Sequence, residues 1–131
     1  MFIPIMNDTG CPTPWEELPC SAITPKMGML LKESSGNLAK ASGTDVPAYI
    51  SMVEKDSACT AGDLIPVIRI EPGNIYETTL SASGSALKIG DKVTVATDGL
   101  RVTATTTSGV AEIVAFMTAE QASGDAVRVR F

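Results

Sequence analysis

Histidine is absent from the 131 residues of this sequence. Because histidine is the most common general base in enzymes, the absence excludes the usual Ser-His and Cys-His pairs. The glycine-rich loops that cradle nucleotide phosphates are missing as well. A Ser-x-x-Lys pattern runs from Ser85 to Lys88, but it lies in a flexible Ser- and Gly-rich stretch and is a common chance match. We therefore expect a protein that is not an enzyme and uses no cofactor or metal.

Charge is scarce too. Charged residues make up 19% of the sequence against 44% apolar residues, and the net charge is −5. An acidic surface repels phosphate backbones, and the nearest approach to a basic cluster is Arg128 with Arg130, so we expect no nucleic-acid partner. The longest apolar runs, such as residues 110–117, are too short to span a bilayer, so we expect no membrane partner. The first residues lack the basic region of a signal peptide, which predicts synthesis in the cytoplasm.

The sequence has only three cysteines, and an odd number argues against a closed disulfide framework. Cys11 and Cys20 frame a short Pro-rich segment that a disulfide could close, although such a bond is unusual in the cytoplasm. Together with Cys59 they would supply three of the four ligands of a structural zinc site. We expect free thiols, and the pairing of Cys11 with Cys20 stays open.

Proline is concentrated at the N-terminal end, where five of the eight prolines lie within the first 25 residues. Proline lacks an N–H donor, so we predict that residues 1–24 form an extended arm outside any sheet. Large apolar side chains in this arm are not typical of a solvated linker, so it should pack on its own domain or on a neighbouring molecule. For Trp15, the alternative is that it closes the open end of the β-core. The candidate contact residues are Phe2, Ile3, Ile5, Trp15 and Leu18.

Residues 25–131 show short strand patterns separated by turn signals. This pattern predicts an all-β fold, a small antiparallel barrel or sandwich with at most one short helical turn near residues 118–122. Asp98-Gly99 is the strongest hairpin signal in the sequence. We expect this domain to fold without the arm. The predicted strands are residues 27–33, 38–41, 48–54, 64–71, 75–80, 92–97, 100–105, 110–116 and 126–131.

A Gly-Asp pair precedes three of these strands, at Gly62-Asp63, Gly90-Asp91 and Gly124-Asp125. Glycine can adopt the positive φ of a tight turn, and an aspartate side chain can accept hydrogen bonds from nearby backbone N–H groups. A calcium site would need clustered carboxylates, which the pattern does not provide. We therefore predict structural turns at these positions.

Five segments of the domain, taken in order, resemble the capsid decoration proteins of tailed bacteriophages: residues 37–41, 63–67, 87–93, 110–115 and 122–129. The resemblance is one of pattern, covers roughly residues 25–131, and includes no motif in the arm. It implies a non-catalytic virion protein on the outer capsid surface. Its partners would be the major capsid protein and, in a homotrimer, copies of itself.

On this hypothesis the arm forms part of the capsid-facing or inter-subunit contact and becomes ordered on binding. The alternative is a receptor- or carbohydrate-binding β-domain of a phage tail or fibre. Sugar rings stack on exposed aromatic side chains, and the candidates for that role are Trp15, Tyr49 and Tyr76.

Overall fold

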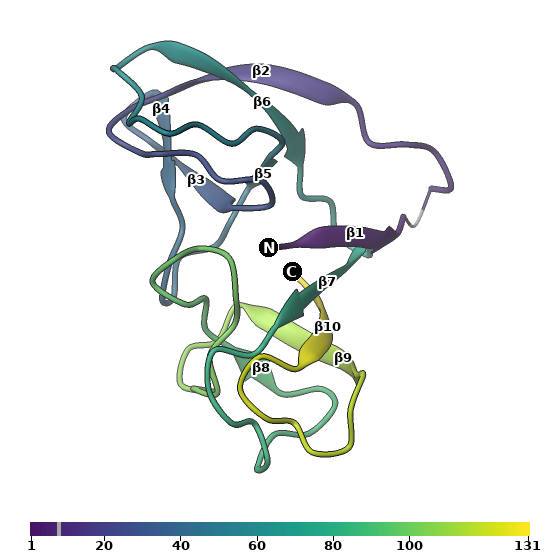
Figure 1. The fold of residues 1–131 in the computed structure, drawn as a ribbon. Coiled ribbons are helices and arrows are strands. Elements are labelled where there is room, and N and C mark those ends of the chain that lie inside the picture. Colours follow the sequence, from purple (N-terminus) through teal and green to yellow (C-terminus); the bar gives the residue numbers. More distant parts are fainter. Residues whose placement is uncertain (8) are drawn as a thin grey trace.

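The fold is known from a computed structural model that describes residues 1–7 and 9–131. Strands account for 39% of the chain, and the described residues contain no helix, which confirms the predicted all-β class. Accordingly, no helix long and apolar enough to cross a membrane occurs in this part of the chain. The ten strands of the described residues form a closed barrel and a separate five-stranded sheet, drawn as the upper and lower halves of Figure 1.

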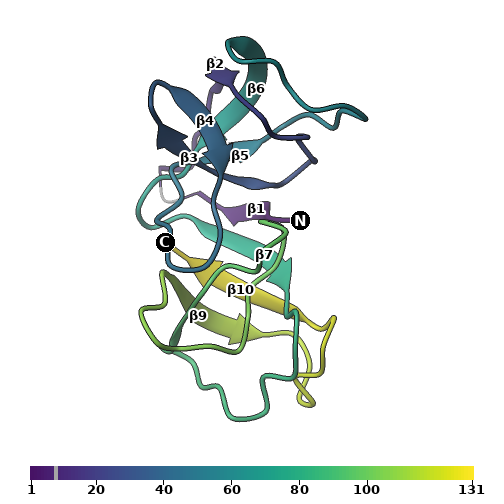
Figure 2. The ribbon, with the colours of Figure 1, turned by 90° about the vertical axis from the view of Figure 1, so that its left-hand side faces the viewer.

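The five-stranded sheet, called sheet A here, is antiparallel throughout. Its β1 edge lies next to the barrel, and β7, β10 and β9 follow in turn away from it (Figure 2). In spatial order its strands are β1 (Ile3–Met6), β7 (Ile75–Thr79), β10 (Ala126–Arg130), β9 (Ala111–Phe116) and β8 (Lys92–Val93).

The barrel is antiparallel except at one point. There β2 and β4 run parallel and pair only at Cys20 with Leu38. In spatial order its strands are β2 (Trp15–Cys20), β4 (Asn37–Lys40), β3 (Leu30–Ser34), β5 (Tyr49–Ser51) and β6 (Asp63–Arg69).

One wall of the barrel is buried on both faces where β3, β5 and β6 meet, at residues 30–31, 49–50 and 67–68. Successive side chains of a strand point to opposite faces, so adjacent apolar residues enter two different cores. The barrel interior takes Leu31, Tyr49 and Val67. The core shared with sheet A takes Leu30, Ile50 and Ile68. Paired apolar residues in the sequence, such as Leu30-Leu31, therefore mark a strand covered on both sides.

Residues 1–24 contribute strands to both halves of the molecule, so the expectation that proline keeps them outside the sheets is wrong. Strand β1 pairs with β7, and β2 pairs with β6 along six residues. Pro4 is tolerated because β1 is an edge strand. Pro19 is tolerated because β2 pairs with β4 only at Cys20. The N–H that Pro19 lacks on this side therefore removes no hydrogen bond between strands.

Phe2 also ties the N-terminal segment to the core. Its side chain is 2% exposed, and its ring centroid lies 5.8 Å from that of Phe131. The Phe2 N–H donates to the Gly28 carbonyl at 2.9 Å. Gly28 has a φ of +73°, and a Cβ there would lie 2.9 Å from the Phe2 nitrogen, so only glycine fits. Removal of the arm would therefore also remove a core side chain, and the expectation that residues 25–131 fold without the arm stays a prediction.

The Asp98-Gly99 turn lies where the sequence predicts it, and the Gly99 N–H donates to the Ala96 carbonyl at 2.9 Å. The flanking segments are less regular than expected. They meet in an isolated bridge between Val95 and Val102, and the predicted strand at residues 92–97 is reduced to β8. The tighter hairpin between β3 and β4 turns at Ser35 and Gly36, both with positive φ.

The three Gly-Asp pairs share one turn geometry. Each glycine has a φ of +90° to +93°. Each aspartate carboxylate accepts a hydrogen bond from the backbone N–H three residues earlier, and the aspartate N–H donates to that same residue's carbonyl. The carboxylate bonds measure 2.9 Å at Asp63, 2.8 Å at Asp91 and 2.7 Å at Asp125. Among the described residues no group of carboxylates or thiols could hold a metal ion.

Two of the three thiols form a disulfide, so the expectation of free cysteines is wrong for them. Cys20 at the end of β2 is bonded to Cys59, 39 residues later, with a Cα–Cα distance of 6.3 Å. Backbone hydrogen bonds from Ala22 to Cys59 and from Cys59 to Ile23 hold the two segments side by side. Cys11, the partner considered from spacing, is free and exposed.

Replacing both Cys20 and Cys59 with alanine should lower the free energy of unfolding by about 4 kcal/mol, because the bond closes a long loop in the unfolded chain. Urea unfolding at neutral pH measures the change. Cys11→Ala is the matched control and should unfold like the wild type. Identical unfolding curves of the wild type with and without a reductant would show that the bond does not stabilise the fold.

Candidate functional site

Large exposed apolar side chains are concentrated in the N-terminal segment. Among the described residues ten such side chains are exposed, and five of them lie within residues 1–24: Met1, Ile3, Ile5, Met6 and Trp15. Contiguous exposed apolar surface on a small domain is typical of a contact with another molecule. Of the predicted contact residues, Ile3, Ile5 and Trp15 are exposed, Leu18 is half-buried, and Phe2 is a core residue unavailable to a partner.

The first exposed group, the β1 patch, consists of Ile3, Ile5 and Met6, which are 42–53% exposed. Strand β1 forms the edge of sheet A, and an apolar edge strand invites pairing with other chains. Here Pro4 removes one backbone donor, and the register shifts between Pro4 and Met6. Both features disfavour the addition of another strand, so the patch presents side chains to a partner more than backbone groups.

The second group, the β2–β6 stripe, runs across two paired strands of the barrel. Trp15 lies opposite Ile68, and Pro19 lies opposite Leu64. The alternation of β2 places Trp15 and Pro19 on the same face. Trp15 is 63% exposed and Leu64 is 58% exposed. With so much of its surface in solvent, Trp15 does not close the end of the β-core, so that alternative is wrong.

Trp15 of the stripe and Pro4 of β1 line one hollow of about 230 Å³. Thr13 of the connecting segment, Ile68 and Asn74 line it as well. Strand β1 and the β2–β6 stripe therefore meet at this hollow through Pro4. We refer to the β1 patch and the β2–β6 stripe together as the N-terminal contact surface.

Leu18 points to the opposite face of β2 and packs against the barrel core. It lies beside a polar network across the open end of the barrel. Glu16 accepts two hydrogen bonds of 3.2 Å from Arg69, whose guanidinium carbon lies 4.9 Å from the centre of the Tyr49 ring. The Tyr49 hydroxyl donates to Glu33 at 3.0 Å. Burial of the hydroxyl, followed by its bond to Glu33, raises the pKa of Tyr49 above its usual range, so it remains a donor at neutral pH.

The basic residues near the C-terminal end are neutralised within sheet A. Arg128 forms an ion pair with Glu77 at 3.2 Å, and Arg130 forms one with Glu112 at 2.6 Å. Each of these two arginines therefore has a carboxylate partner within the sheet. The Ser-x-x-Lys segment is also not organised as a site, because Ser85 and Lys88 are exposed in non-helical turns.

Three of the hollows in the described surface have volumes of about 200, 230 and 290 Å³. Small-molecule sites usually enclose about 300–1,000 Å³, so these hollows are at or below the lower limit. Their size suits single side chains of a partner better than a metabolite.

The comparisons with known proteins give no relative: no family model, no curated protein and no solved structure matches the chain.

Phe2→Ala should lower the free energy of unfolding by about 3–5 kcal/mol, because it leaves a cavity in the shared core beside Phe131. Ile89→Ala, at a side chain that is 69% exposed, should change it by less than about 0.5 kcal/mol. Chemical denaturation of both variants tests the assignment. Equal losses would mean that Phe2 is not the anchor of the N-terminal segment.

Proposed function

We propose that this protein is a non-enzymatic structural protein that binds the outer surface of a tailed-phage capsid and stabilises contacts between major capsid protein subunits. In this role it acts as a homotrimer and belongs to the virion. The pattern resemblance of residues 25–131 to capsid decoration proteins suggests the class of partner. The observation that carries the proposal is the N-terminal contact surface.

The N-terminal contact surface has the composition of a protein-binding site. An exposed tryptophan surrounded by aliphatic side chains and proline is a frequent anchor in such interfaces. The surface is held by strand pairing on both sheets, which differs from the expectation that the arm becomes ordered on binding. A preformed surface loses less conformational entropy when it binds, so more of the contact free energy appears as affinity.

Modest contacts are sufficient if they are repeated. A trimer presents three copies of the surface to one lattice, so binding of the first copy raises the effective concentration of the other two. A modest affinity of each copy is therefore compatible with firm attachment to a capsid.

Replacing both Ile5 and Trp15 with serine should reduce binding to capsids at least tenfold, since a central tryptophan anchor commonly contributes more than about 1.4 kcal/mol. Co-sedimentation with purified heads of the phage that carries this sequence measures binding. Ile89→Ser, which removes an even more exposed apolar side chain elsewhere, should bind like the wild type.

Three results would contradict the proposal: a wild-type protein that does not sediment with heads, a double variant that binds normally, and a bound stoichiometry that is not a multiple of three. Thermal unfolding of each variant checks that loss of binding does not reflect loss of the fold.

A carbohydrate-binding domain is the second candidate, because Trp15 lies beside the polar side chains of Asn7, Thr13 and Asn74. The structure weakens this candidate. Tyr49 and Tyr76 are 3% and 1% exposed, which leaves Trp15 as the one aromatic residue that the described surface exposes fully enough for stacking. A glycan array separates the candidates, since a capsid-binding protein should show no glycan-specific signal.

A further inference from the structure

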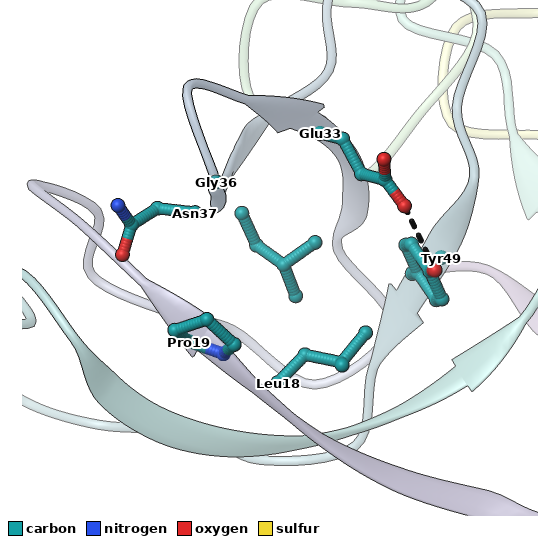
Figure 3. A pocket seen from close by; sticks show the side chains of 7 residues that line it. Leu18, Pro19, Glu33, Gly36, Asn37 and Tyr49 are labelled. Carbon is teal, nitrogen blue, oxygen red and sulfur yellow. Dashed lines mark hydrogen bonds between the residues drawn. The ribbon is translucent and has the colours of Figure 1, made fainter.

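A second recognition site lies at the open end of the barrel, where it shares Pro19 with the β2–β6 stripe. Strands β2 and β4 pair only at Cys20 with Leu38, so the wall opens beyond this point. The opening forms a pocket of about 200 Å³ (Figure 3). Its lining comes from four strands and the β3–β4 turn, and consists of Leu18, Pro19, Glu33, Gly36, Asn37, Leu38 and Tyr49.

Most of the pocket lining is apolar. Leu18 and Pro19 line one side, while the ring of Tyr49 stands opposite Asn37 in Figure 3. These groups offer van der Waals contact to an alkyl chain and no hydrogen bonds along its length. The volume is below that of usual metabolite sites and suits one long side chain.

The single charged group of the lining is Glu33. One carboxylate oxygen accepts the Tyr49 hydroxyl hydrogen bond at 3.0 Å, as the dashed line in Figure 3 shows. Among the described residues no lysine or arginine forms an ion pair with Glu33. Arg69, which lies over the Tyr49 ring, is already bound by Glu16 through two hydrogen bonds. Glu33 therefore keeps hydrogen-bonding capacity for an additional donor.

The pocket is also held in shape. The Asn37 side-chain oxygen accepts a hydrogen bond of 3.2 Å from the Gly62 N–H, which ties the start of β4 to the turn before β6. Tyr49 is fixed from both sides, by Glu33 and by the guanidinium of Arg69. A preformed pocket with a negative end complements a ligand with an alkyl stem and a positive end.

We propose that this pocket binds a lysine or arginine side chain presented by a partner protein. The alkyl stem contacts Leu18, Pro19, Leu38 and the Tyr49 ring, and the cationic end donates to the Glu33 carboxylate. The net charge of −5 favours the approach of such a basic segment. The inference goes beyond the proposed function and does not depend on which protein the N-terminal contact surface covers.

The test is an NMR titration of the full chain with N-acetyl-lysine methylamide, followed through the backbone and methyl signals of the pocket. Saturable shifts are expected at Leu18, Leu38 and Tyr49. The uncharged analogue N-acetyl-norleucine methylamide has the same stem without the ammonium group. It should bind about three to five times more weakly, since an ion pair at a solvent-accessible site contributes modestly.

Glu33→Gln should reduce affinity for the lysine probe by the same factor, while its amide oxygen still accepts the Tyr49 hydroxyl. Glu17→Gln is the matched control, because it removes an equal charge from an exposed position on β2 that does not line the pocket. Glu17→Gln should change the affinity for the lysine probe by less than a factor of about 1.5, because salt screens the interaction between separated exposed charges.

Equal binding of the two probes, equal effects of the two substitutions, or shifts that map outside the pocket would each overturn the proposal. A failure of this titration leaves co-sedimentation with phage heads unaffected, because the variants used there do not touch the pocket.

Discussion

Burial of one barrel wall on both faces is the constraint on which the rest of this structure depends. Strands β3, β5 and β6 supply side chains to the barrel interior and to the core beneath sheet A, so neither half can be removed without exposing the other. Each N-terminal strand is anchored to one of these cores. Phe2, next to β1, enters the shared core, and Cys20, at the end of β2, enters the barrel interior. The exposed side chains between these anchors therefore occupy fixed positions.

Local patterns in the sequence predicted much of the β-structure. The Asp98-Gly99 turn depends on the residues at the turn itself, which is why it could be located without knowledge of the fold. Local patterns could not predict which prolines lie within strands. Pro4 is acceptable because β1 has no second neighbour, and Pro19 because β4 diverges from β2, and both facts belong to the tertiary topology. The bond between Cys20 and Cys59 likewise depends on a loop folding back over 39 residues.

The candidate contact residues show the same division. The apolar residues of the N-terminal segment were identified from composition, and Ile3, Ile5 and Trp15 are indeed exposed, but composition could not distinguish Phe2 as a core residue. The polar network at the open end of the barrel gave no signal at all. Glu16, Glu33, Tyr49 and Arg69 come from four different strands, so no spacing in the sequence relates them. Barrel closure alone brings them together.

The ring contact between Phe2 and Phe131 has a practical consequence. It places both ends of the described chain together, midway between the barrel and sheet A (Figure 1). A short linker could join them, and the chain could be reopened at an exposed loop such as residues 82–83 without loss of any strand pairing. A circularly permuted chain of this kind would carry a fused peptide at that exposed loop instead of between the barrel and sheet A. The fold is therefore a convenient scaffold for the display of peptides.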